Sequence, residues 1–87
     1  MLLEIKKATH IHDYSIRVLF NDGVEGNVDL KSTIFNDKRK IFSPLKEIDY
    51  FKKFYISLNT ICWKNDLDLA PEYIKEKMVE QNGVTDR

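Results

Sequence analysis

This chain of 87 residues has little of what marks the specialised protein classes: one cysteine, three glycines, two prolines and no net charge. Because Cys62 is the single cysteine, it cannot form an internal disulfide, and nothing in the chain requires an oxidising compartment. So few glycines and prolines exclude a collagen-like or low-complexity chain. Fourteen basic residues balance fourteen acidic ones, which argues against strong non-specific binding of nucleic acid.

Long hydrophobic runs are missing as well. The longest unbroken apolar runs have three residues, such as Val18–Phe20 and Ile61–Trp63, whereas a helix that spans a membrane needs about 20. Glu4 interrupts the apolar start of the chain, where a signal peptide would have a continuous apolar stretch. We therefore expect a cytoplasmic protein that does not enter a membrane.

The composition is that of one small globular domain, with 43% hydrophobic and 32% charged residues. We expect a single domain over residues 1–87, ending in a helix and tail over residues 71–87. A chain of this length builds only a small core, which leaves little room for a cleft that holds both a cofactor and a substrate. We expect no cofactor.

Alternating apolar and polar residues predict strands in the first third of the chain. Asp22-Gly23 between two such segments is typical of a hairpin, because Gly accepts positive φ. The segment Val24–Leu30 then returns as the partner strand, and an earlier strand near Leu3 completes a three-stranded antiparallel meander. The period of two places four residues on the buried face of the central strand: Tyr14, Ile16, Val18 and Phe20.

The next segment is less regular. Asp29 or Ser32 is a suitable cap for a short helical turn over residues 33–35. Ser43 followed by Pro44 predicts the start of a short, broken helix over residues 44–53. Its apolar residues recur every three positions: Leu45, Ile48 and Phe51.

Two further elements close the chain. β-Branched and aromatic residues predict a second hairpin around Asn59. A final helix starts within Leu69–Glu72, with Pro71 at its beginning, and Gly83 is a suitable end. The predicted fold class is α+β: a small antiparallel sheet, made of a three-strand meander plus a second hairpin, packed with a short middle helix and a C-terminal helix.

Two sets of motifs point to one family. The first set is Asp13-Tyr14, Phe20-Asn21-Asp22-Gly23, Gly26 and Val28-Asp29-Leu30. The second is Leu45, Phe51, Ile61-Cys62-Trp63 and Asp68-Leu69-Ala70-Pro71-Glu72. Over residues 3–75 the chain resembles, on these motifs, the bacterial family called domain of unknown function 2442. Asn65-Asp66 stands where the family usually has Asn-Gly, and we expect the turn to be kept, because Asp adopts left-handed conformations more readily than most residues.

The resemblance implies a small α+β domain without established catalysis. Some relatives carry a helix-turn-helix domain, and some are encoded beside another small protein in an arrangement that suggests a toxin–antitoxin pair. The fifteen residues after Glu72 are too few for a helix-turn-helix. We assign a structural role to the motif residues Asp22, Gly23, Asp29, Asp68, Pro71 and Glu72.

Sites for chemistry have weak support. His10 and His12 would point the same way on a strand, but a zinc site needs three or four ligands. Asp66, Asp68 and Glu72 form an acidic cluster that suits a cation or glycoside chemistry. The interpretation we favour is that Asp68 and Glu72 stabilise the start of the last helix. No serine or cysteine lies in a nucleophile motif. We expect no metal site and no enzymatic activity.

Charge is uneven along the chain. Residues 31–53 have a net charge of +4, between segments of net charge −2 on either side. Basic residues interleaved with aromatic ones are typical of surfaces that bind phosphates and bases. The interpretation we favour is a solvated loop and a helix whose aromatics are core. The candidate basic patch is Lys38, Arg39, Lys40, Lys46, Lys52 and Lys53.

A surface for a partner protein is the favoured function. Edge strands of small sheets present unpaired backbone groups, and tyrosine and tryptophan are enriched at interface hot spots. The candidate interaction surface is Tyr50, Tyr55, Trp63 and Tyr73, with Phe20, Phe51 and Ile61 in the core. We expect a non-enzymatic interaction module that binds another small protein or itself, antitoxin-like in a two-protein system. The alternative is a nucleic-acid-associated regulator that uses residues 38–53.

Overall fold

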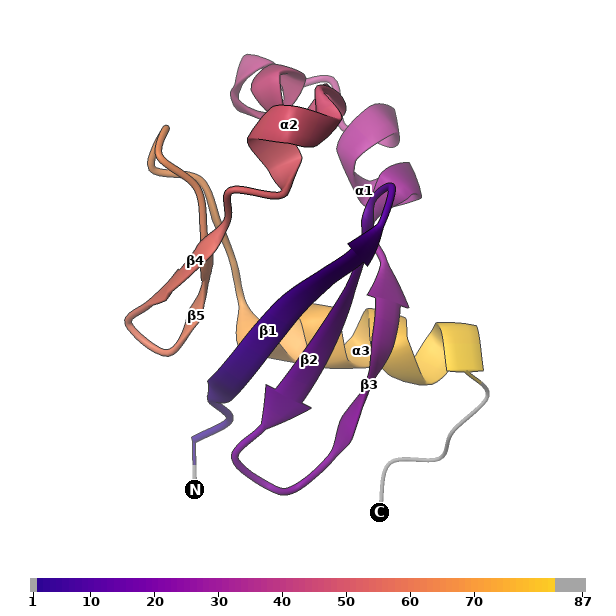
Figure 1. Ribbon diagram of the computed structural model, residues 1–87, viewed down its shortest axis with the longest axis vertical. Coiled ribbons are helices and arrows are strands. Elements are labelled where there is room, and N and C mark those ends of the chain that lie inside the picture. Colours follow the sequence, from indigo (N-terminus) through magenta and orange to yellow (C-terminus); the bar gives the residue numbers. More distant parts are fainter. Residues whose placement is uncertain (1, 83–87) are drawn as a thin grey trace.

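The computed structural model describes residues 2–82 of the chain. Two antiparallel sheets, a helical segment between them in the sequence and a final helix make up the fold (Figure 1). The elements, in chain order, are β1 (Ile5–His12), β2 (Ser15–Phe20), β3 (Glu25–Asp29), α1 (Lys31–Asn36), η1 (Lys40–Lys46), α2 (Ile48–Phe51), β4 (Tyr55–Ser57), β5 (Thr60–Cys62), β6 (Asp68–Leu69) and α3 (Pro71–Asn82). The predicted α+β class is confirmed.

The first sheet is the expected meander, in the order β1-β2-β3. Gly23 has φ +89° in the turn between β2 and β3, which is the conformation for which glycine was expected there. The four residues predicted for the buried face of the central strand, Tyr14, Ile16, Val18 and Phe20, are all buried. Because β2 has the strict period of two, its outer residues Arg17 and Leu19 face away from this core.

The helical segment comprises α1, η1 and α2, and η1 differs from the prediction in its starting point. We expected one helix to begin after Ser43, but the 3-10 helix η1 begins at Lys40 and contains Pro44, and α2 follows from Ile48. Phe42 and Leu45, three residues apart, are both buried, and a 3-10 helix, which has three residues per turn, places them on one side. The prediction of a broken helix is confirmed. The prediction of Ser43 as its N-cap is wrong, because Arg39 has that position.

The second sheet contains one strand more than predicted. The hairpin of β4 and β5 is as expected, with Leu58 and Asn59 in its turn. The segment Leu69–Glu72 was expected to open the last helix, but its first residue, Leu69, belongs to β6, which pairs with β5. Asp66 has φ +70° in the turn before β6, so the aspartate adopts the left-handed conformation that was expected for it.

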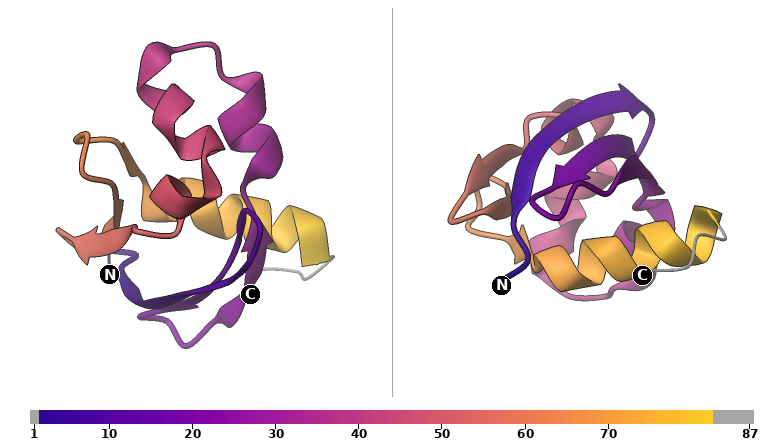
Figure 2. Two further views of the ribbon diagram at one scale, coloured as in Figure 1. Left: turned by 45° about the horizontal axis from the view of Figure 1, so that its top comes forward. Right: turned by 90° about the horizontal axis from the view of Figure 1, so that it is seen from below.

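Helix α3 crosses the first sheet beside β3, as the view from below shows (Figure 2). It begins at Pro71 as predicted and buries Ile74 and Met78. The suggested end at Gly83 lies outside the described residues. Gly26 allows the close approach, since a Cβ there would lie 3.0 Å from the Met78 sulfur.

The end of α3 closes the outer edge of β3. The Gln81 side chain both accepts a hydrogen bond from the Asp29 N–H (2.7 Å) and donates one to the Asp29 carbonyl (2.8 Å). Asn82 donates a further bond to the Asn27 carbonyl (2.9 Å). A side-chain amide thus takes the place of a neighbouring strand at this edge, which leaves β1, β4 and the two-residue strand β6 as the edges without such a cover among residues 2–82.

A single core joins both sheets, the helical segment and α3. Phe51 lies at its centre, with ring contacts to Trp63 (5.8 Å) and Tyr14 (5.3 Å). The Trp63 indole N–H donates to the Phe51 carbonyl (2.9 Å), and the Tyr14 hydroxyl donates to the Lys46 carbonyl. These two bonds tie the helical segment to the second and first sheets respectively.

The Tyr14→Phe variant tests this anchor of the helical segment. We expect its free energy of unfolding to fall by about 1–2 kcal/mol, because the Lys46 carbonyl loses its donor while the aromatic ring stays in place. Tyr55→Phe is the matched control, since the Tyr55 side chain is 47% exposed, and it should change stability by less than about 0.5 kcal/mol. Urea denaturation measures both; equal values for the two variants would contradict the anchoring role of Tyr14.

Candidate functional site

Three of the four aromatic residues proposed for an interaction surface come together. Tyr50, Tyr55 and Trp63 line one hollow of about 320 Å³ beside the second sheet. Trp63 is only 1% exposed, so it is a core residue and offers almost no surface of its own, which corrects its place in that set. Tyr73 lies elsewhere, on α3, where its hydroxyl is hydrogen-bonded to the Thr33 hydroxyl (2.7 Å).

The residues of the candidate basic patch all lie on or beside the helical segment, but acidic and aromatic groups engage half of them. Arg39 pairs with Asp37 (2.7 Å) and lowers the pKa of that carboxyl to about 2. Lys52 pairs with Asp49 (3.3 Å), and the Lys46 ammonium lies 5.7 Å from the centre of the Phe35 ring.

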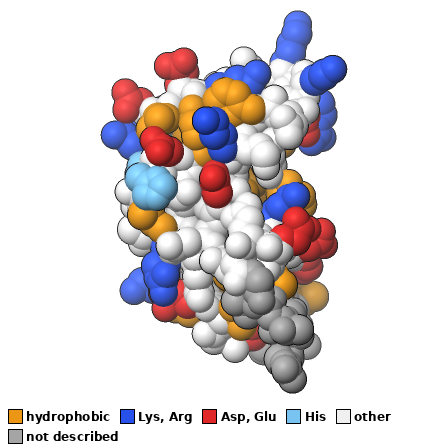
Figure 3. Space-filling model, turned by 90° about the vertical axis from the view of Figure 1, so that its right-hand side faces the viewer, with side chains coloured by type: hydrophobic (Ala, Val, Ile, Leu, Met, Phe, Trp, Pro, Cys, Tyr) orange, Lys and Arg blue, Asp and Glu red, His pale blue; other side chains and the backbone are white. Residues whose placement is uncertain are grey.

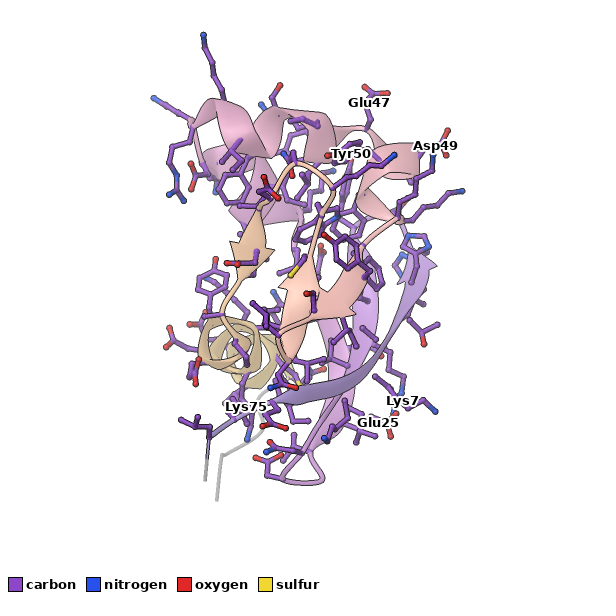
Figure 4. The ribbon with its side chains drawn as sticks, turned by 90° about the vertical axis from the view of Figure 1, so that its left-hand side faces the viewer. Lys7, Glu25, Glu47, Asp49, Tyr50 and Lys75 are labelled. Carbon is purple, nitrogen blue, oxygen red and sulfur yellow. The ribbon has the colours of Figure 1, made fainter. Side chains whose placement is uncertain are left out.

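The surface of the helical segment is accordingly mixed. Lys and Arg side chains project at its upper end, with acidic and hydrophobic side chains among them (Figure 3). Glu47 and Asp49 lie close to Tyr50 on the same segment (Figure 4). The predicted basic residues therefore share a segment without forming a purely positive face.

The two histidines do not act as a pair. A bulge between them in β1 shifts the register of the strand, so His10 is opposite Ile16 and His12 opposite Ser15. His10 packs edge-on against Phe51 at 6.1 Å, while His12 is exposed. In the part of the chain that the structure describes, no three His, Cys, Asp or Glu residues gather in a group suited to a metal ion.

The acidic cluster divides among three local roles. Asp66 forms the turn before β6, Asp68 belongs to β6, and Glu72 lies in the first turn of α3 as predicted. The Cys62 thiol has a raised pKa, first because it is partly buried and second because Asp68 is nearby. Cys62 is thereby held as the protonated thiol, which is a weak nucleophile.

Asp22 and Asp29 have the structural roles that their motif suggested. The Asp22 side chain accepts a hydrogen bond from the Val24 N–H (3.0 Å) and forms an ion pair with Lys75. Asp29 accepts a bond from the Lys31 N–H (2.9 Å) at the start of α1. Each carboxylate thus closes a turn that leads into the next element.

Lys75 is a residue that sequence reasoning missed. It is 6% exposed between α3 and the turn after β2, and its ammonium lies 5.6 Å from the centre of the Phe20 ring (Figure 4). Beside it is a hollow of about 630 Å³, lined by Leu3, Asp22 and residues of α3. The sequence has no signal for this burial, because Lys75 merely follows Ile74 in a helix rich in charge.

The hairpin of β4 and β5 carries the most exposed apolar residues near the second sheet. Leu58 is 92% exposed at its tip, and Tyr55 and Ile56 on β4 are 47% and 38% exposed. Leu58 has φ +50° and Asn59 φ +67°, the pattern of a type I′ turn, which favours Asn and Gly. An apolar residue at such a turn position was the one signal in the sequence for this surface.

Among residues 2–82 there is no helix of the length and apolar character needed to cross a membrane. Two three-stranded antiparallel sheets around one core, with a closing helix on the first of them, define a small α+β domain. The family model described as protein of unknown function (DUF2442) matches residues 5–80. The chain belongs to this family, as its motifs suggested. No curated protein and no solved structure matches it.

The Asp22→Asn variant tests the ion pair under α3. The pKa of Asp22 is lowered, first by its hydrogen bond to Lys75. A carboxyl with a depressed folded-state pKa adds stability above its unfolded value and loses that contribution as the pH falls through the folded value. We expect the variant to be about 1–2 kcal/mol less stable at pH 7.

Denaturation at several pH values checks this expectation. The difference between the native chain and the Asp22→Asn variant should shrink once the pH falls below the ordinary Asp value of 3.8. A difference that stays constant from neutral to acid pH would contradict the role of the Asp22 charge.

Proposed function

We propose that this domain is a non-enzymatic protein-interaction module of the cytoplasm and that the hairpin of β4 and β5 is its contact surface. One observation carries the proposal: Leu58 is 92% exposed at the hairpin tip and has a positive φ. A leucine in this left-handed conformation costs about 1 kcal/mol relative to residues that adopt it readily. Its apolar side chain also gains nothing from burial in the isolated domain.

The backbone of β4 supports the same proposal. Ser57 and Thr60 flank the two-residue turn and form a hydrogen-bonded pair. Pairs alternate along antiparallel strands, so the next pair, Ile56 and Ile61, is a non-hydrogen-bonded pair. The N–H and C=O of Ile56 therefore point away from β5. No strand among residues 2–82 pairs with this side of β4, so an added strand finds unused donors and acceptors there.

The tip of the hairpin is held in position. The Ile5 N–H at the start of β1 donates to the Asn59 carbonyl (2.9 Å), next to Leu58. A contact residue on a fixed turn loses little conformational entropy when a partner binds. The proposal thus combines an exposed apolar tip, an open strand edge and a fixed backbone.

The partner we propose is another small protein, in a two-protein system in which this chain has the antitoxin-like role; a second copy of the chain is the other candidate. The family resemblance supports the first candidate, since some relatives are encoded beside a second small protein. The role as a nucleic-acid-associated regulator stays a prediction, and the acidic residues among the basic ones of the helical segment weaken it.

The Leu58→Asn variant separates stability from binding. Asn adopts the left-handed conformation more readily than Leu, so the free energy of unfolding should rise by about 0.5–1 kcal/mol. Binding should fall, because the apolar contact is lost. Unfolding by urea measures the first effect; affinity purification of the co-expressed neighbouring gene product, together with sedimentation equilibrium for self-association, measures the second.

Ile41→Asn is the matched control, because Ile41 is 37% exposed on η1 rather than on the hairpin. It should bind as the native chain does. The proposal fails if the Leu58→Asn variant binds as well as the native chain, or if the native chain is monomeric and does not bind the neighbouring product.

A further inference from the structure

Three aromatic residues line the hollow beside the second sheet. Tyr50 comes from α2, Tyr55 from the start of β4 and Trp63 from the chain just after β5. Trp63, with 1% exposure, forms its floor, and Tyr55, with 47% exposure, forms part of its wall. At about 320 Å³ the hollow is at the lower end of the range for ligand sites, which suits one apolar side chain better than a cofactor.

The two other residues that line this hollow are lysines. Lys53 and Lys64 are both exposed, and neither forms an ion pair with any residue in the described range 2–82. Glu47 and Asp49, the acids nearest to Tyr50 in the sequence, do not line the hollow, and Asp49 is paired with Lys52. The hollow therefore has an apolar interior and a positive rim.

We propose that this hollow receives one aromatic or large aliphatic side chain from an extended segment of the partner, and that acidic residues flanking that side chain meet Lys53 and Lys64. The proposal rests on the interaction function proposed above and specifies the chemistry of the partner.

Tyr55 connects the hollow with the open edge. It is the first residue of β4 and at the same time lines the hollow, so a strand that pairs with β4 passes the mouth of the hollow. In an extended segment, alternate side chains point to the same side, and binding by strand addition uses pockets for such side chains to gain specificity. The hydrogen bonds of the edge give affinity, and the hollow and its two lysines select the sequence.

A nucleic-acid base is a poorer occupant. Stacking of bases needs exposed aromatic faces. Trp63 is buried and Tyr50 is half-buried, so Tyr55 alone offers a substantial exposed ring. A single ring with two lysines does not form a platform for successive bases, and the observations favour an acidic peptide.

Trp63, the single tryptophan of the chain, reports on the hollow through its fluorescence. The probes are three synthetic heptapeptides with blocked ends: Thr-Glu-Thr-Phe-Thr-Glu-Thr, the same peptide with Ser for Phe, and the same peptide with Lys for both Glu. We expect saturable binding of the first at a Kd on the order of 1 mM or below. The other two should bind at least about fivefold more weakly, since they lack the apolar side chain or the charge complementarity.

The double variant Lys53→Glu/Lys64→Glu should bind the first peptide with an affinity about 5- to 10-fold lower than that of the native chain. Added salt should weaken binding of the same peptide to the native chain. Lys38→Glu/Lys40→Glu is the matched control: it makes the same change in net charge on exposed lysines outside the hollow. This control should bind as the native chain does. Equal effects of the two double variants, equal binding of the Lys peptide, or no saturable change in fluorescence would each overturn the proposal.

The two proposals fail separately. If Leu58→Asn abolishes binding of the neighbouring product and Lys53→Glu/Lys64→Glu leaves it unchanged, the hairpin remains the contact surface and the selective hollow is wrong. If the acidic Phe peptide binds as expected but no protein partner or second copy binds at the hairpin, the proposed selectivity of the hollow is supported and the proposed interaction function is wrong. Preferential binding of a single-stranded oligonucleotide over the acidic peptide, with loss in the Lys53→Glu/Lys64→Glu variant, would overturn the choice of a peptide.

Discussion

The buried indole of Trp63 is the contact on which the rest of the structure depends. Its N–H donates to the Phe51 carbonyl, and its ring packs against Phe51 and Phe54. These contacts join α2 to the chain after β5, so they fix the helical segment relative to the second sheet. They also form the floor of the hollow, which means that one side chain supports both the core and the proposed selectivity.

The open edge of β4 contrasts with the closed edge of β3. Gln81 and Asn82 cover the outer edge of β3 with side-chain amides, although α3 could end earlier without loss of its apolar contacts at Ile74 and Met78. At β4 no element of residues 2–82 covers Ile56 in this way, and an exposed leucine lies at the tip. Natural domains protect their edge strands, so an open and apolar edge supports the contact surface proposed above.

Local signals made much of the fold predictable. The first sheet follows from the period of two in β2 and from the Asp22-Gly23 turn, both of which act over a few residues. Strand β6 could not be found, because two residues carry no period and its pairing depends on β5. The start of η1 was misplaced because Ser43-Pro44 has the composition of an N-cap, while the burial of Phe42 extends the 3-10 helix further back.

The sequence predicted which residue types form the candidate site. It did not predict where the fold places each of them. Tyr50, Tyr55 and Trp63 do gather, but whether an aromatic residue lies in the core or at a surface depends on packing across the whole chain, which buries Trp63 and separates Tyr73. Lys53 came to attention as part of a basic run, and its place beside Lys64 depends on how α2 meets β5. Leu58 was missed although an apolar residue in a tight turn was a signal for it, because its exposure becomes evident only in the folded hairpin.

Amide hydrogen exchange of the native domain, with and without the co-expressed neighbouring protein, tests the central claim most directly. If the hairpin is the contact surface, binding slows exchange at the Ile56 and Leu58 amides and leaves α1 and η1 unchanged. Protection confined to residues 38–53, or absent from β4, would contradict this account.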